Sequence, residues 1–239
     1  MVPVGRALAA GLVALSALLA GLTATRGLTV PAWGTGLVCG GLVAVAVARG
    51  LARDHADHLT PADAVTLTRA MIACAVAALV VESWLGNAAT APLVGLAVIA
   101  LVLDAVDGRV ARVTRRSTGF GARFDGEADA FLLLVLSAHV AASHGVWVLA
   151  IGAARYAFWA AGSAWPWLRS PLPRRDWRKV VTAVQGIVLV VAAADVAPRS
   201  AVTLALVAAL VLLTESFGRD VLWLVRRRPG ARLVGASAP

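Results

Sequence analysis

The sequence predicts an all-α fold, a polytopic transmembrane helical bundle, on three observations. The 239-residue chain is 60% hydrophobic and only 15% charged, with a mean hydropathy of +0.82, whereas a soluble domain is about a quarter charged. Apolar runs close to the length of about 17–25 residues that spans a bilayer recur from end to end. These runs lack the alternation of a β-strand, and only helices or closed barrels satisfy the backbone in lipid.

Eight helical spans are predicted in order along the chain. The first follows Arg6, and a second apolar run comes directly after it, which argues against a cleaved signal peptide. The third begins at Thr60-Pro61, a favourable helix start. A short polar connection separates the fourth span from the fifth. The predicted ranges are 7–24, 31–48, 62–83, 91–113, 119–143, 146–165, 178–195 and 200–224.

The polar loop Leu51–Thr60 is the clearest boundary in the chain. It divides a two-helix N-terminal membrane unit, residues 1–59, from a six-helix core, residues 60–225. The remaining residues, 226–239, form a basic tail that contains proline and glycine and is predicted to be disordered. We therefore expect a six-helix catalytic core with two additional N-terminal transmembrane helices.

Basic residues give the orientation of the bundle, because they concentrate in loops that stay in the cytoplasm. All but four of the 22 lysines and arginines fall at the N-terminus, in the loops after spans two, four and six, or at the end of span eight. Arg26 and Arg199 lie on the other side, and Arg69 and Arg155 lie within spans. Both termini are thus predicted to be cytoplasmic. This topology also accounts for the formal charge of +9, so no nucleic-acid partner is expected.

Four aspartates at a fixed rhythm interrupt the apolar pattern. The string reads Asp104-x2-Asp107-Gly108-x2-Ala111-Arg112-x8-Gly121-x3-Asp125-x3-Asp129. The acids of the fourth span share one helical stripe, and those of the fifth share another. The connection between the spans is short, so an antiparallel hairpin is expected to bring the two stripes face to face. The sequence therefore predicts four carboxylates around one small volume near the cytoplasmic surface.

Such a cluster points to bound cations. Carboxylates that crowd together repel unless positive charge lies among them, and charged groups at membrane depth mark functional sites. Hard divalent ions prefer carboxylate oxygens and keep water and phosphate as their other ligands. Two such ions about 3.5–4 Å apart clamp a phosphoryl group during displacement. Gly108 and Gly121 leave room for a ligand to approach the backbone, and Arg112 offers a fixed charge to a phosphate oxygen.

The string from Asp104 to Asp129 resembles the signature of the CDP-alcohol phosphotransferase family. Eight fixed residues and every spacer match, so the resemblance is specific. It implies transfer of a phosphatidyl group from a CDP-linked donor, usually CDP-diacylglycerol, to an alcohol acceptor, with release of CMP, in phospholipid biosynthesis. It also implies a lipid bilayer as the setting, two Mg²⁺ or Mn²⁺ ions per site and a homodimer.

The resemblance extends more weakly over about residues 60–224. The stretch 66–69 is similar to the opening of the family's first core helix, and the stretch 179–185 to the start of its fifth. Roles carried over by position make Asp129 a catalytic base as well as a metal ligand. The implied metal ligands are Asp104, Asp107, Asp125 and Asp129. The implied residues of the CDP site are Gly108, Ala111, Arg112, Gly121 and Thr66.

Several charged residues outside the string have open roles. Arg155 lies within the sixth span and is a candidate for binding the acceptor; the alternatives are snorkelling or an ion pair with Glu82, Asp195 or another helix. Lys179 is a second acceptor candidate, and the alternative is that it only follows the positive-inside rule. Glu127 is expected to be solvated, and the acids and arginine of 215–220 are expected to form local pairs.

The acceptor itself is not readable from the sequence. Glycerol phosphate, inositol phosphate, serine and phosphatidylglycerol all stay open, and a lipid acceptor would make the chain a cardiolipin-type synthase. A different CDP donor is a further alternative. A transporter or scaffold that retains the fold without catalysis is the alternative from another class, and metal-dependent release of CMP separates it from an enzyme.

Overall fold

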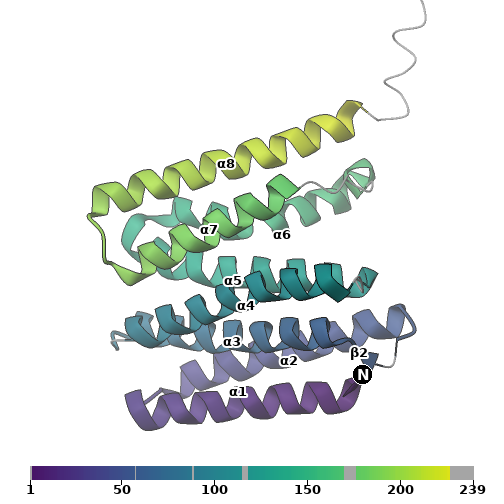
Figure 1. Cartoon of the computed structure of the whole chain (residues 1–239). Helices are drawn as coiled ribbons and strands as arrows, with labels where there is room; N and C mark the ends of the chain where they lie inside the picture. The colour runs from purple at the N-terminus through teal and green to yellow at the C-terminus, as the bar shows by residue number, and fades with distance from the viewer. Residues whose placement is uncertain (1, 57, 88, 115–117, 170–175, 227–239) are drawn as a thin grey trace, which may run out of the picture.

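The computed structural model describes residues 2–56, 58–87, 89–114, 118–169 and 176–226. All eight predicted spans are α-helices, arranged in stacked rows (Figure 1). Two residues near the N-terminus, β1 (Val2–Pro3), pair antiparallel with β2 (His58–Leu59), which the sequence did not predict. The helices are α1 (Val4–Arg26), α2 (Val30–Arg53), α3 (Pro61–Trp84), α4 (Thr90–Thr114), α5 (Gly119–His144), α6 (Leu149–Ala164), α7 (Asp176–Ala194) and α8 (Arg199–Arg226), with 3-10 turns η1 (Val146–Val148) and η2 (Pro166–Arg169).

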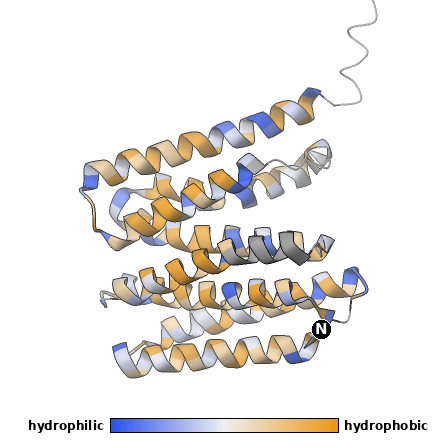
Figure 2. Cartoon of the chain, viewed as in Figure 1, coloured by the Kyte–Doolittle hydropathy of each residue, from blue (hydrophilic) through white to orange (hydrophobic). Residues whose placement is uncertain are grey.

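Six of the described helices are long and apolar enough to cross a membrane: α1, α2, α3, α5, α7 and α8. The helix α4 contributes a shorter apolar stretch, Thr90–Ala105, and α6 has 16 residues. Hydrophobic residues run along most of each helix (Figure 2). The predicted polytopic helical bundle is therefore confirmed.

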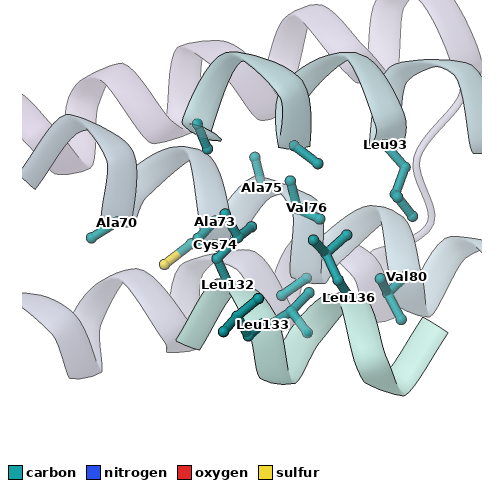
Figure 3. Close-up of a cluster of buried hydrophobic side chains, with 14 of the residues drawn as sticks. Ala70, Ala73, Cys74, Ala75, Val76, Val80, Leu93, Leu132, Leu133 and Leu136 are labelled. Carbon is teal, nitrogen blue, oxygen red and sulfur yellow. The ribbon is translucent and has the colours of Figure 1, made fainter. Parts of the chain in front are cut away.

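Helix α3 is the central element of the bundle and packs against α1, α2, α4 and α5. It is apolar nearly all round, as expected for a helix that is covered on every side. Small residues such as Ala73 and Cys74 share a buried cluster with Leu132 and Leu136 of α5 and Leu93 of α4 (Figure 3). Small side chains on α3 let its neighbours approach closely, as in membrane bundles generally.

Helices α1 and α2 share the core of α3 rather than standing apart from it. The end of α2 also meets the start of α5: a Cβ atom on Gly50 would lie 2.6 Å from the ring of Phe120. Nearby, Arg123 donates to both carboxylate oxygens of Asp54, at 2.7 and 3.0 Å. The two N-terminal helices thus fix the beginning of α5. The division at residue 59 stays a prediction.

A buried carboxylate ties the other end of α2 to α3. Glu82 accepts hydrogen bonds from the backbone nitrogen and the hydroxyl of Thr29, at 3.0 and 2.8 Å. It also accepts one from the side chain of Asn87. Because Thr29 is the residue before α2, this network sets where α2 begins. Glu82 is therefore not the partner of Arg155, which was one of the predicted alternatives.

The N-terminus and the last turn of α8 lie at the same end of the bundle, on the right in Figure 1. The β1–β2 pair, the start of α3 and the start of α5 lie at this end as well. The predicted basic tail, 226–239, falls outside the described residues apart from its first position. The predicted site residues belong to α3, α4, α5, α6 and α7.

Candidate active site

Three of the four predicted aspartates come together in the structure. Asp104 of α4 and Asp125 and Asp129 of α5 place carboxylate oxygens within 4.8 Å of one another. The spacing of four residues puts the two α5 acids on one face, as predicted. Both α4 and α5 pack against α3 and α7, and this shared packing brings the acids together. We call these three residues the acidic triad.

A buried arginine holds the acidic triad together. Arg69 of α3 is only 3% exposed, and its Nη1 lies 2.9 Å from Asp104 Oδ1 and 2.8 Å from Asp125 Oδ1. Its Nη2 pairs with Asp129 Oδ1. A guanidinium is a rigid fork of donors that suits several carboxylates at once. Arg69 therefore lowers the repulsion among the acids and fixes their positions.

Arg69 is not among the site residues predicted from the sequence. Its position predicts only that it lies within a span and within the stretch 66–69 that is similar to the family. The available signal was an arginine deep in an apolar helix, because an intramembrane charge needs a partner and marks a site. Only the packing of α3 between α4 and α5 shows which partners it has.

Local sequence sets the position of Arg69 along α3. Thr60 and Asp63 form a capping box: the Thr60 hydroxyl accepts from the Asp63 backbone nitrogen, and the Asp63 carboxylate accepts from the Thr60 nitrogen at 2.9 Å. Pro61 occupies the first turn, where its missing N–H costs nothing. Thr66 is also buried, and its hydroxyl donates to the carbonyl of Ala62 at 3.2 Å. Thr66 lies one turn before Arg69 on the same side of α3.

Gly121 allows the start of α5 to approach the start of α3. A Cβ atom on Gly121 would lie 2.5 Å from Asp63 Oδ1 and 3.0 Å from the hydroxyl of Thr118. That hydroxyl caps α5 by accepting from the Gly121 nitrogen at 2.9 Å. The predicted room beside this glycine is therefore filled by a carboxylate of the chain itself. Its predicted contact with CDP stays a prediction.

The remaining members of the string lie at the end of α4. Their backbone belongs to that helix, and their side chains lie outside the part of the chain that the structure describes. Their predicted roles stay predictions. These residues are Asp107, Gly108, Ala111 and Arg112.

A cavity of about 170 Å³ opens beside Asp129. Residues of α5, α6, α7 and α8 line it, so it is built from segments far apart in the sequence. Asp129 belongs both to the acidic triad and to the wall of this cavity. The polar and charged members of the wall are Asp129, Arg155, Arg178, Thr182, Gln185, Ser216 and Asp220.

Arg155 lines this cavity and pairs with another helix. Its Nη2 and Nε donate to Glu127 Oε1 at 2.8 and 3.1 Å. A Cβ atom on Gly126 would lie 3.0 Å from the guanidinium, so this glycine makes space for Arg155 against α5. Glu127 is exposed, as expected for a solvated residue, with 56% of its side chain accessible, and it is also paired with Arg155.

The pairs on α7 and α8 correct one expectation. Arg219 pairs with Glu215 one turn away, as predicted. Asp220 instead accepts from Arg178 of α7 at 2.7 Å, because its place on α8 faces the cavity and not solvent. Lys179 is exposed and is not among the residues that line the cavity, so its predicted role in binding the acceptor stays a prediction. No local pattern predicts the Arg178–Asp220 contact, because it joins residues from different helices.

The donor set of the acidic triad fits a hard divalent cation. Carboxylate oxygens from two helices converge within 4.8 Å, and such oxygens are the ligands that Mg²⁺ and Mn²⁺ prefer. Three carboxylates face one guanidinium, so the group holds more negative than positive charge. The site has the chemistry to attract cations.

Comparison with known families decides what this geometry belongs to. The family model of CDP-alcohol phosphatidyltransferase matches residues 59–215. The chain belongs to the CDP-alcohol phosphatidyltransferase family. No curated protein and no solved structure matches the chain.

Membership states the reaction class. CDP-alcohol phosphatidyltransferases are transferases of substituted phosphate groups that act in phospholipid synthesis, with CDP-alcohol donors and alcohol acceptors, and they depend in general on divalent metals. The matched region contains α3, α4 and α5, which carry Arg69 and the acidic triad. It excludes α1 and α2, as the resemblance implied. The six long apolar helices and the family match indicate that this CDP-alcohol phosphatidyltransferase is an integral, multi-pass membrane protein.

Proposed function

We propose that this chain transfers a phosphatidyl group from CDP-diacylglycerol to the hydroxyl of an alcohol and releases CMP. One observation carries the proposal: the acidic triad around Arg69 borders a cavity that has polar and charged side chains on its wall, and Asp129 belongs to both. A phosphate donor on the triad side and an alcohol on the cavity side would meet at this residue. Positioning and charge stabilisation dominate catalysis of phosphate transfer.

The reaction forms one phosphorus–oxygen bond and breaks another. The acceptor oxygen attacks the phosphorus of the phosphatidyl group. The bond from that phosphorus to the bridging oxygen of the diphosphate breaks, and CMP leaves with the electron pair. Asp129 takes the proton of the attacking hydroxyl, because it is the triad acid on the cavity wall. A positioned general base is the usual device for this transfer.

Two divalent cations, Mg²⁺ or Mn²⁺, would be held by the four aspartates of the string and would supply positive charge to the attacking and leaving oxygens. Arg69 keeps three of those aspartates in place from the buried side. The donor's CDP group is assigned to the residues that match the family string and to one residue of α3. These are Gly108, Ala111, Arg112, Gly121 and Thr66.

The orientation of the site in the membrane is proposed from the arginines near it. Arg49, Arg53 and Arg123 lie in or beside the connections at the end of the bundle where α3 and α5 begin. By the positive-inside rule this end faces the cytoplasm, so the site and both termini are proposed to be cytoplasmic. A water-soluble acceptor would then enter from the cytoplasm and a lipid-linked donor from the bilayer. We further propose that the protein acts as a homodimer, as the family resemblance implies.

The test is CMP release by the purified full-length protein in detergent. CDP-diacylglycerol is supplied with separate acceptors, first with EDTA and then with Mg²⁺ or Mn²⁺ added back. The proposal expects CMP only with metal and with one acceptor. Folded protein that releases no CMP with any acceptor or metal contradicts it and favours a non-catalytic membrane role.

A further inference from the structure

The cavity between α5, α6, α7 and α8 has polar and charged side chains on its wall that are not part of the acidic triad. Its volume of about 170 Å³ is well above the roughly 10–15 Å³ that a single water molecule needs. Thr182 and Ser216 add hydroxyl groups to a wall that already holds charged and amide side chains. The cavity lies beside Asp129. It is smaller than the roughly 300–1,000 Å³ of sites for drug-sized ligands, so it suits only a small molecule.

Gln185 of α7 shows that the cavity is built for a ligand. The residue is 2% exposed, and its Nε2 has no hydrogen-bond partner among the described residues. Buried polar groups almost always have a hydrogen-bond partner, because a buried donor without one destabilises the fold. This amide lines the cavity, so a bound molecule with an acceptor oxygen would satisfy it.

Both arginines of the cavity wall have a carboxylate partner. Arg178 faces Asp220 at 2.7 Å, and Arg155 faces Glu127 at 2.8 Å. A phosphate dianion would enter a space where both guanidinium groups already have carboxylates, and it would lie close to Asp129 and Asp220. Like charges at such distances are unfavourable. Hydroxyl groups, in contrast, donate to carboxylates and accept from amide and guanidinium groups.

We propose that this cavity binds the acceptor alcohol, and that the acceptor is an uncharged polyhydroxy alcohol without a phosphate group. The inference rests on the proposed function, since it places the acceptor's reacting hydroxyl at Asp129. Gln185 donates its amide N–H to a second oxygen of the polyol. Asp220, held by Arg178, accepts from a further hydroxyl. These two residues determine acceptor specificity and do not touch the reacting phosphorus.

The first experiment compares acceptors. The full-length protein in detergent receives CDP-diacylglycerol and Mg²⁺ or Mn²⁺, with glycerol, inositol, their phosphate esters or serine supplied separately, and CMP is measured. The inference expects release with glycerol or inositol, at least about tenfold above the matching ester. Release that requires a phosphate ester, or that occurs only with serine, overturns the inference while leaving the proposed function in place.

The second experiment tests the named residues. Gln185→Met and Asp220→Asn are each expected to raise the KM for the polyol at least about tenfold, with little change in the KM for CDP-diacylglycerol. Two control variants on α8, Thr214→Val and Glu215→Gln, remove a hydroxyl and a charge outside the cavity wall and leave both constants unchanged. Equal KM values in Gln185→Met and wild type overturn the assignment.

Binding without turnover separates the two proposals. The melting temperature of the protein is followed as glycerol or inositol is added without donor. Gln185→Met is measured at the same concentrations, because a general osmolyte effect would raise its melting temperature as well. Stabilisation of the wild type that is absent in Gln185→Met supports the cavity assignment even if no CMP appears, and then the proposed function fails alone. If neither stabilisation nor CMP release is found, both proposals are overturned.

Discussion

The two sides of Asp129 differ in how their charges are balanced. On the triad side, three carboxylates surround the single guanidinium of Arg69. On the cavity side, each arginine has its own carboxylate. The first arrangement has more negative than positive charge, so it is suited to bind cations. In the second arrangement the paired charges cancel, so it is suited to bind a polar, uncharged molecule. The contrast assigns metal and phosphate to one side and the alcohol to the other.

Removing one carboxylate of the triad should have the largest effect. Asp125→Asn is expected to lower CMP release at least about 100-fold, because even the loss of a group that only supports a metal ligand costs about 10–100-fold. Expression and membrane insertion should be unchanged. The matched control is Asp54→Asn, which makes the same change at the exposed pair with Arg123. Activity of Asp125→Asn close to that of the control would contradict the ligand assignment.

Removing the charge of Arg69, which pairs with the triad, should lower the stability of the protein. In Arg69→Gln the carboxylates lose their counter-charge, which for buried pairs costs about 3–5 kcal/mol. Asp104 and Asp125 are about 40% exposed, so solvent screening reduces the effect. We expect a lower melting temperature in EDTA and a larger rise on adding Mn²⁺ than in wild type. Thermal unfolding in detergent measures both, and an unchanged response to Mn²⁺ would refute the role given to Arg69.

A methyl group at the start of α5 should disturb the position of the triad. Gly121→Ala places a carbon 2.5 Å from Asp63 Oδ1, and overpacking of this kind costs about 1–3 kcal/mol. Gly95→Ala on α4 is the control, since no atom lies within 4 Å of its added carbon. Melting temperatures of the two variants are compared. Equal values would show that α5 shifts freely at this point.

The smallest effect is expected at the exposed pair on the cavity side. Arg155→Ala should raise the KM for the acceptor a few-fold, while Glu127→Gln should change it less than about twofold. Exposed ion pairs contribute only about 0.2–1 kcal/mol to stability, so neither variant should unfold the protein. Steady-state kinetics with the acceptor varied measures this difference. An unchanged acceptor KM in Arg155→Ala would remove that residue from the acceptor site.

The two sides also differ in how far the sequence predicts them. The two α5 acids of the triad were predictable because Asp125 and Asp129 share one helix face through their spacing. The short connection from α4 to α5 predicted that Asp104 lies near them, but the structure brings it there by packing both helices against α3 and α7. The cavity was not predictable, because Arg178, Gln185 and Asp220 come from helices whose packing has no local signal. The same holds for Arg69: its partners depend on α3 lying between α4 and α5. Hydropathy, which needs only local sequence, predicted all eight helices.

The most direct test of this account is the number of Mn²⁺ ions that the purified protein binds. Electron paramagnetic resonance during a Mn²⁺ titration, with CDP-diacylglycerol present, counts the free and bound ions. We expect two bound ions per chain in wild type and fewer in Asp125→Asn, with the Asp54→Asn control matching wild type. Absence of bound Mn²⁺ in folded wild-type protein, or the same number in Asp125→Asn, would contradict the claim that the acidic triad is a metal site.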